Sequence, residues 1–296
     1  MTNSLAHKLT SGQSVVTAEC LPPRSGDREG VKRLSAALPE SLDAIVVSDT
    51  SREIHGSSLG CAALLAQQKR TTIVTMLTRD RNRVALENDA LAAATLGVNG
   101  ILSLSGDHQL LGTNPQAAGA YDIDSIQFTK ALKDMTRGLD LEGRSIDPKP
   151  ELLVGAVVQP YLQPSELNLI CLKKKVAAGA DFLLTQAVFD LAGFAQWLSL
   201  VRAAGIDRKT AIIASVLPLT SVEKANRLKD QKSCGPIGEG VIARLAGSAD
   251  PAQEGVAMAT EIAGQLKGIP GVRGIHILSG GCESLTSEVM KGAGLV

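Results

Sequence analysis

The chain has 296 residues and a formal net charge of zero, because 30 Lys and Arg balance 30 Asp and Glu. This balance argues against a nucleic-acid-binding protein, which needs a basic face against the phosphates. Hydrophobic residues make up 44% of the chain, yet it has one Trp, two Tyr and four Phe, so we expect a large aliphatic core and exclude extensive disorder.

Eight short apolar segments alternate along the chain with longer segments of helical spacing. The short segments are rich in Val and Ile and apolar on both faces, as in a parallel sheet covered by helices. We expect strands at residues 15–19, 44–48, 72–76, 100–104, 152–157, 182–186, 211–215 and 274–278. Helical spacing is clearest at residues 84–96, 167–178, 194–204 and 256–266.

This alternation predicts an α/β protein with a (β/α)8, or TIM, barrel as a single domain over residues 1–296. Gly97, Gly179 and Gly205 follow predicted helices, where a left-handed residue commonly ends the helix. Eight such units fit a closed barrel better than an open doubly wound sheet. Residues 106–120 predict a long loop, and we expect an extra helical segment around residues 232–268, before the last strand.

Polar residues gather at the expected C-terminal ends of the strands, which form the active face of such barrels. The clearest is Glu19, which follows an apolar strand and precedes Cys-Leu-Pro-Pro-Arg24. Partial removal from water would favour the protonated form of its carboxyl group and suit it to proton donation. The alternative is that Glu19 only forms an ion pair with Arg24 at a solvated rim.

Three further strand-end or helical features suggest ligand contacts. Asp107 follows Gly106 after the fourth strand, where the backbone could approach a ligand closely or form an Asx turn. Gln186 ends the sixth strand, and its amide could bind a planar heterocycle or cap a helix. The run of lysines at residues 173–175 indicates a solvated helix face, or a phosphate contact from one of the three.

Several classes of site and location lack support in the sequence. The four histidines do not have the spacing of a metal site, so we expect no metal. The five cysteines are widely spaced and form no C-x-x-C pair, which indicates a reducing cytoplasm rather than a disulfide framework. We also expect no membrane span and no signal peptide, because no apolar run is long enough for either.

Three motifs resemble the methylenetetrahydrofolate reductase family. They are Glu19-Cys-Leu-Pro-Pro-Arg24, Ser105-Gly-Asp107 and the long segment at residues 173–190. Their order and spacing agree with the family from about Val15 to the C-terminus. The segment Gly-Val-Arg-Gly-Ile-His-Ile-Leu at residues 271–278 is similar to the ending of the shorter, acetogen-type members.

The resemblance implies a (β/α)8 barrel that holds a flavin, usually FAD with FMN as the alternative, and reduces 5,10-methylenetetrahydrofolate to 5-methyltetrahydrofolate in one-carbon metabolism and methionine biosynthesis. Electrons would come from NAD(P)H or from an iron–sulfur partner subunit, and the protein would be an oligomer. Glu19 matches the family's general acid, which assists opening of the five-membered ring to an iminium ion. Asp107 matches a carboxylate near the flavin and the pterin, and Gln186 matches a glutamine that contacts folate and nicotinamide in turn.

The resemblance also implies a set of flavin-binding positions, which are Ser48, Met76, Thr78, Ser105, Gly106, Asp107, Asp124, Asn168 and Lys175. Four of them depart from the family's usual residues: Ser48 replaces Thr, Met76 replaces His, Ser105 replaces Arg and Asn168 replaces Asp. Residues 217–222 lack the Phe that stacks on the ligand, and Cys282 lies where an Arg for the folate tail is expected.

Two other functions remain open from the sequence. One is a pterin-binding barrel methyltransferase that acts with a corrinoid protein and needs no flavin. The other is a non-catalytic barrel subunit of a redox complex, which the missing Phe and Arg favour and which the presence of Glu19, Asp107 and Gln186 opposes. A barrel fold alone does not distinguish them.

Overall fold

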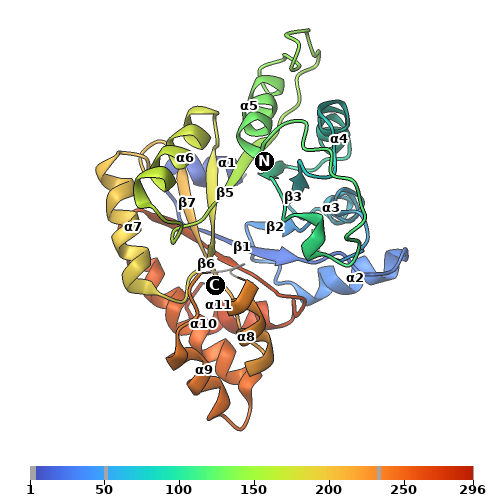
Figure 1. Cartoon of the computed structure of the whole chain (residues 1–296). Helices are drawn as coiled ribbons and strands as arrows, with labels where there is room; N and C mark the ends of the chain where they lie inside the picture. Colours follow the sequence, from blue (N-terminus) through green and yellow to red (C-terminus); the bar gives the residue numbers. More distant parts are fainter. Residues whose placement is uncertain (1–4, 50–52, 232–234, 296) are drawn as a thin grey trace.

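Eight parallel strands pair in chain order and close into a barrel in the computed structural model, which describes residues 5–49, 53–231 and 235–295 (Figure 1). The predicted barrel is therefore confirmed, and each predicted strand lies within two residues of the observed one at both ends. The strands are β1 Val15–Cys20, β2 Ala44–Val47, β3 Thr72–Leu77, β4 Gly100–Leu104, β5 Leu153–Val158, β6 Phe182–Ala187, β7 Ala211–Val216 and β8 Val272–Ile277.

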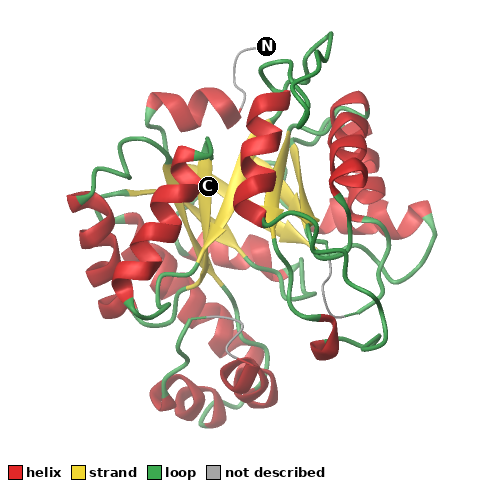
Figure 2. Cartoon of the chain, turned by 45° about the horizontal axis from the view of Figure 1, so that its top comes forward, coloured by secondary structure: helices red, strands yellow, loops and turns green. Residues whose placement is uncertain are grey.

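Helices surround the strands, which stay at the centre of the molecule (Figure 2). The predicted C-terminal glycines are confirmed, since Gly97, Gly179 and Gly205 have φ of +79°, +102° and +66°. The helices are α1 Leu5–Ser11, α2 Arg28–Ala37, α3 Ser58–Gln67, α4 Arg83–Thr95, α5 Ser125–Met135, α6 Ser165–Ala177, α7 Leu191–Ala203, α8 Val222–Gln231, α9 Glu239–Ala246, α10 Pro251–Lys267 and α11 Leu285–Gly292. None of the helices in the described ranges is long and apolar enough to cross a membrane.

The two irregular stretches take different forms. The predicted loop after β4 contains one short 3-10 helix, η1 Gln109–Leu111, and otherwise no regular element. The stretch predicted to be extra helix contains α9 and α10, while its residues 232–234 lie outside the described residues. In Figure 1, α8, α9 and α10 form a group at one side of the barrel.

The N-terminal end of the barrel interior is filled with apolar side chains. Leu5 and Leu9 of α1 pack there against inward-facing residues of the strands, including Phe182. Gly155 on the neighbouring strand makes room for Phe182, because an added Cβ would lie 2.2 Å from its ring. The cavity inside the barrel lies toward the opposite end of the strands.

Paired hydrogen bonds fasten neighbouring strands at this filled end. In each pair, the first residue lies just before β2, β4 or β6, and the second lies in the preceding strand. The first residue donates its backbone N–H to the carbonyl of the second. The side-chain oxygen of the first residue accepts the backbone N–H of the second. The pairs are Asp43 with Val16, Asn99 with Thr72, and Asp181 with Val154, with the side-chain bonds at 2.8, 2.9 and 2.9 Å. These contacts match the stabilising role of the N-terminal face in such barrels.

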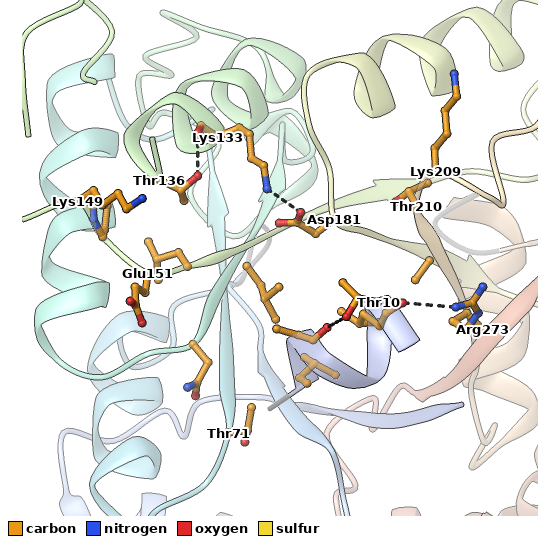
Figure 3. A pocket seen from close by; sticks show the side chains of 18 of the residues that line it. Thr10, Thr71, Lys133, Thr136, Lys149, Glu151, Asp181, Lys209, Thr210 and Arg273 are labelled. Carbon is orange, nitrogen blue, oxygen red and sulfur yellow. Dashed lines mark hydrogen bonds and ion pairs between the residues drawn. The ribbon is translucent and has the colours of Figure 1, made fainter. Parts of the chain in front are cut away.

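A hollow of about 890 Å³ lies at the same end and is shown in Figure 3. Its polar side chains serve the framework: Lys133 binds Asp181 at 2.6 Å, and Arg273 donates to the carbonyl of Leu9 at 3.4 Å. No site residue predicted from the sequence lines it, so size alone does not identify the functional site.

We predict that Asp181→Ala lowers the free energy of unfolding by about 1–3 kcal/mol, because it leaves the N–H of Val154 without its acceptor. Asp181→Asn is the matched control, since Asn99 makes the equivalent bond with an amide oxygen. Denaturant unfolding should show that Asp181→Asn recovers most of the lost free energy of unfolding. This variant lacks only the ion pair with Lys133, which is partly exposed and therefore contributes little. Equal losses in both variants would show that the ion pair, and not the strand contact, carries the effect.

Candidate active site

Three hollows meet at the C-terminal end of the barrel, and Gln186 lines all of them. The central cavity, about 400 Å³, contains Glu19 and His276. The α6 hollow, about 480 Å³, contains Asp107 and Lys175. The α8 hollow, about 540 Å³, lies between the β5–α6 loop and α8. The structure thus brings Glu19, Asp107 and Gln186 to one face, as predicted from the strand ends.

Glu19 is held in the wall of the central cavity by donors from both sides. Its Oε1 accepts from the hydroxyl of Ser48 at 2.7 Å, and its Oε2 accepts from the N–H groups of Ser279 and Gly280 at 3.1 and 3.2 Å. Arg24 instead lies 3.3 Å from Glu53, so the alternative ion pair with Glu19 is not formed. Ser48, which is predicted to bind the flavin, therefore donates its hydroxyl hydrogen to Glu19.

Lys224 fixes the turn that supplies one of these donors, and sequence analysis missed it. Its Nζ, on α8, donates to the carbonyl of Gly280 at 3.0 Å, and burial lowers the pKa of Lys224. Gly280 has φ of +53°, and an added Cβ would lie 2.5 Å from that Nζ. In the sequence, the adjacent glycines at residues 280 and 281 indicate a turn after the last strand. The hydrogen bond from Lys224 of α8 to this turn forms only in the folded chain and could not be read from the sequence.

Gln186 lies at an irregularity of the barrel. The β6–β7 pairing shifts register between Leu184 and Ala187, and bulges of this kind commonly re-aim a side chain next to an active site. The hydroxyl of Thr185 donates to the carbonyl of Gln186 at 2.8 Å. Asp190, not Gln186, caps α7, and the Gln186 amide makes no hydrogen bond to any residue in the described ranges. The amide is thus available to a ligand.

Arg79 holds the loop that carries Asp107. Its guanidinium, 5% exposed, donates to the carbonyl of Asp107 at 2.6 Å and makes a two-point contact with Asp80. Gly106 has φ of +86°, and an added Cβ would meet Arg79 and Leu77 at 3.4 Å. The position of Asp107 at the α6 hollow therefore depends on a buried arginine at the end of β3.

Two α6 residues predicted to bind the flavin also line the α6 hollow. Asn168 donates to the carbonyl of Gln159 at 2.8 Å and to that of Leu162 at 3.2 Å, and so orders the β5–α6 loop. Lys175 donates to the carbonyl of Val157, and burial lowers its pKa. Its neighbours Lys173 and Lys174 are exposed. Of the three lysines, Lys175 is placed to meet an anion.

The remaining flavin-binding predictions divide into two groups. Ser105 and Gly106 line the α6 hollow, with Ser105 bonded to Ser125 at 3.0 Å. Met76 and Thr78 are 1% and 2% exposed and line none of the three hollows. Asp124 caps α5 by accepting from the N–H groups of residues 126 and 127. We leave Met76, Thr78 and Asp124 out of the proposed site.

Comparison with known proteins gives one family over nearly the whole chain: residues 4–294 match the family described as methylenetetrahydrofolate reductase. The chain is 30% identical over 227 residues to methylenetetrahydrofolate reductase 2 of Saccharomyces cerevisiae, covering 73% of this chain and 36% of the yeast protein. It is 25% identical to 5,10-methylenetetrahydrofolate reductase of Escherichia coli, covering 74% of this chain and 69% of that protein. The chain therefore spans about a third of the yeast relative.

Among solved structures, a protein from Clostridium thermocellum that binds two copies of 5-methyl-5,6,7,8-tetrahydrofolic acid is similar with a TM-score of 0.68. The alignment covers 99% of this chain and 100% of that one at 16% identity. Tryptophan synthase from Mycobacterium tuberculosis is similar with a TM-score of 0.51 at 12% identity, covering 98% and 99% of the two chains. At these identities, both likenesses concern the barrel fold alone.

We predict that Gly280→Ala displaces the ammonium group of Lys224 from the carbonyl of residue 280, because the new Cβ collides with that Nζ. Gly281→Ala is the control, since Gly281 has φ of +87° and its added Cβ meets nothing closer than 4.0 Å. Both variants should lose about 1–2 kcal/mol of unfolding free energy from the left-handed backbone. Crystal structures should show the contact between Lys224 and the carbonyl of residue 280 broken only in Gly280→Ala, and an intact contact there would contradict the role assigned to Lys224.

Proposed function

Since this chain belongs to the methylenetetrahydrofolate reductase family, we propose that it reduces 5,10-methylenetetrahydrofolate to 5-methyltetrahydrofolate at the central cavity, with a bound flavin. The observation that carries the proposal is the carboxylate of Glu19, which Ser48, Ser279 and Gly280 hold in the wall of a cavity shared with Gln186. The proposal covers this chain alone, since the yeast relative is much longer.

The residues that line the central cavity and the α6 hollow support the proposal of a bound flavin. The central cavity has aliphatic walls against which a flat ring system can pack, supplied by Leu104, Val157, Leu184, Leu217 and Leu278. The α6 hollow adds Lys175, a partly desolvated ammonium group whose charge a phosphate would offset. We propose that Ser105, Gly106, Asn168 and Lys175 hold FAD on this side, and that its reduced ring supplies the hydride.

Glu19 is proposed to give its proton to N10 of the folate, which breaks the bond from N10 to the methylene carbon and leaves an iminium ion. The donors around Glu19 would keep its carboxyl group fixed in the cavity wall during this step. The charge of Asp107, in the adjoining hollow, would favour the cationic iminium. The Gln186 amide, which both donates and accepts, would hold the pterin edge.

The folate assignment has support from two directions. The family and the names of its relatives specify this substrate, and the solved C. thermocellum neighbour binds 5-methyl-5,6,7,8-tetrahydrofolic acid. We further propose that the electrons come from NAD(P)H or from a redox partner subunit.

We predict that Glu19→Gln lowers methylenetetrahydrofolate turnover by about 10²–10⁴-fold, the usual range for loss of a general acid. Flavin absorbance of the purified protein should remain, because Gln keeps the side-chain size and an acceptor for Ser48. Arg24→Gln is the control, since the exposed Arg24 contacts Glu53 at the rim and should leave turnover unchanged. Turnover of Glu19→Gln close to that of the wild type would contradict the acid assignment, and a wild-type protein that binds no flavin would contradict the cofactor.

A further inference from the structure

His276 places an imidazole ring in the floor of the central cavity. It lies on β8, where the register pairs it with Thr17 of β1 and Ser215 of β7, and it faces the barrel interior together with Glu19. The residue is 3% exposed, yet it lines the cavity. It does not take part in the chemistry proposed above.

The hydrogen bond on one side of the ring determines its tautomer. Nδ1 lies 2.9 Å from the hydroxyl oxygen of Thr17, and Thr17 is 1% exposed. This hydroxyl has no other partner among the described residues, so its buried hydrogen is satisfied only by donation to Nδ1. Nδ1 is then the acceptor, and the ring hydrogen is on Nε2.

The imidazole is neutral at physiological pH. Burial lowers the pKa of His276 to about 4, and the charge of Glu19 opposes this shift only in part. A neutral ring with this pKa is a poor proton donor or acceptor near pH 7, whereas its N–H remains a good hydrogen-bond donor. Nε2 itself has no hydrogen-bond partner in the part of the chain that the structure describes.

The other hydroxyl groups of the cavity already use their hydrogens. Ser48 donates to Glu19, Thr75 to the carbonyl of Val47, Thr185 to that of Gln186, and Ser215 to that of Thr185. Of the described side chains that line the central cavity, Gln186 and His276 are thus the ones with uncommitted donors. Gln186 lies at the rim where the hollows meet, and His276 lies in the floor.

We propose that the Nε2–H of His276 is a ligand-binding donor, which bonds to a carbonyl oxygen or ring nitrogen of the planar heterocycle seated over the barrel centre. The inference rests on the proposed function in that this heterocycle is a flavin or a pterin, both of which carry such acceptors. His276 binds and orients the ring and transfers no proton. Its partner Thr17 sets the tautomer and is a positioning residue.

The first test measures binding with His276→Leu, which removes the donor, and His276→Gln, which returns an amide N–H near the place of Nε2. We expect His276→Leu to weaken binding of one heterocycle by about tenfold, the effect of one hydrogen bond, and His276→Gln to recover most of it. A raised Kd for FAD added to flavin-free protein identifies the flavin as partner. An unchanged FAD Kd with a raised KM for methylenetetrahydrofolate identifies the pterin.

His55→Gln is the matched control, because His55 bonds the carbonyl of Pro22 outside the cavity and should change neither constant. If the wild type binds both heterocycles and His276→Leu binds them equally well, the inference is wrong while the proposed function stands. If the wild type binds neither, both are wrong.

The second test uses the unaltered protein and so does not depend on whether a variant folds. Long-range proton–nitrogen NMR spectra of histidine-labelled protein should show Nε2 protonated and Nδ1 unprotonated. The Nε2 resonance should shift when the partner heterocycle is added, and Thr17→Val should redistribute the tautomers. A protonated Nδ1, or an Nε2 resonance that neither ligand moves, would overturn the inference.

Discussion

Closure of eight parallel strands into a ring is the constraint on which the rest of the structure depends. A closed ring sends alternate side chains of each strand into a narrow interior, and this chain fills one half of that interior with Phe182 and the leucines of α1. The other half carries polar side chains, among them Glu19, Ser215 and His276. The apolar side chains extend part of the way along the barrel axis, and the central cavity with its polar side chains begins where they end.

The hydrogen bonds around the cavity show how few groups are left for a ligand. Glu19 accepts hydrogen bonds from the hydroxyl of Ser48, just after β2, and from the hydroxyl and N–H of Ser279 and the N–H of Gly280 after β8. Arg79 holds the backbone of Asp107, and a bulge on β6 sets Gln186. Glu19 and Asp107 are therefore fixed by elements other than their own strands, whereas Gln186 is set by an irregularity of its own strand.

The barrel could be predicted from the sequence because its signals are local: short Val- and Ile-rich runs, helical spacing, and glycines where helices end. Glu19, Asp107 and Gln186 could be placed because strand ends share one face. Met76 lies in the hydrophobic core, as simple alternation along the strand predicts, since its neighbour Thr75 lines the cavity. Lys224 could not be predicted, because its contact with Gly280 joins segments that meet only in the folded protein.

The reciprocal pairs formed by Asp43, Asn99 and Asp181 lie at the rim opposite the cavity. The carboxylate oxygens of Asp43 and Asp181 and the amide oxygen of Asn99 accept equivalent backbone N–H bonds. Each of these positions can therefore exchange Asp for Asn without a change in geometry. Evolution or a protein engineer could thus tune the heat resistance of the framework at one mouth of the barrel, and ligand preference at the other, as two nearly independent traits.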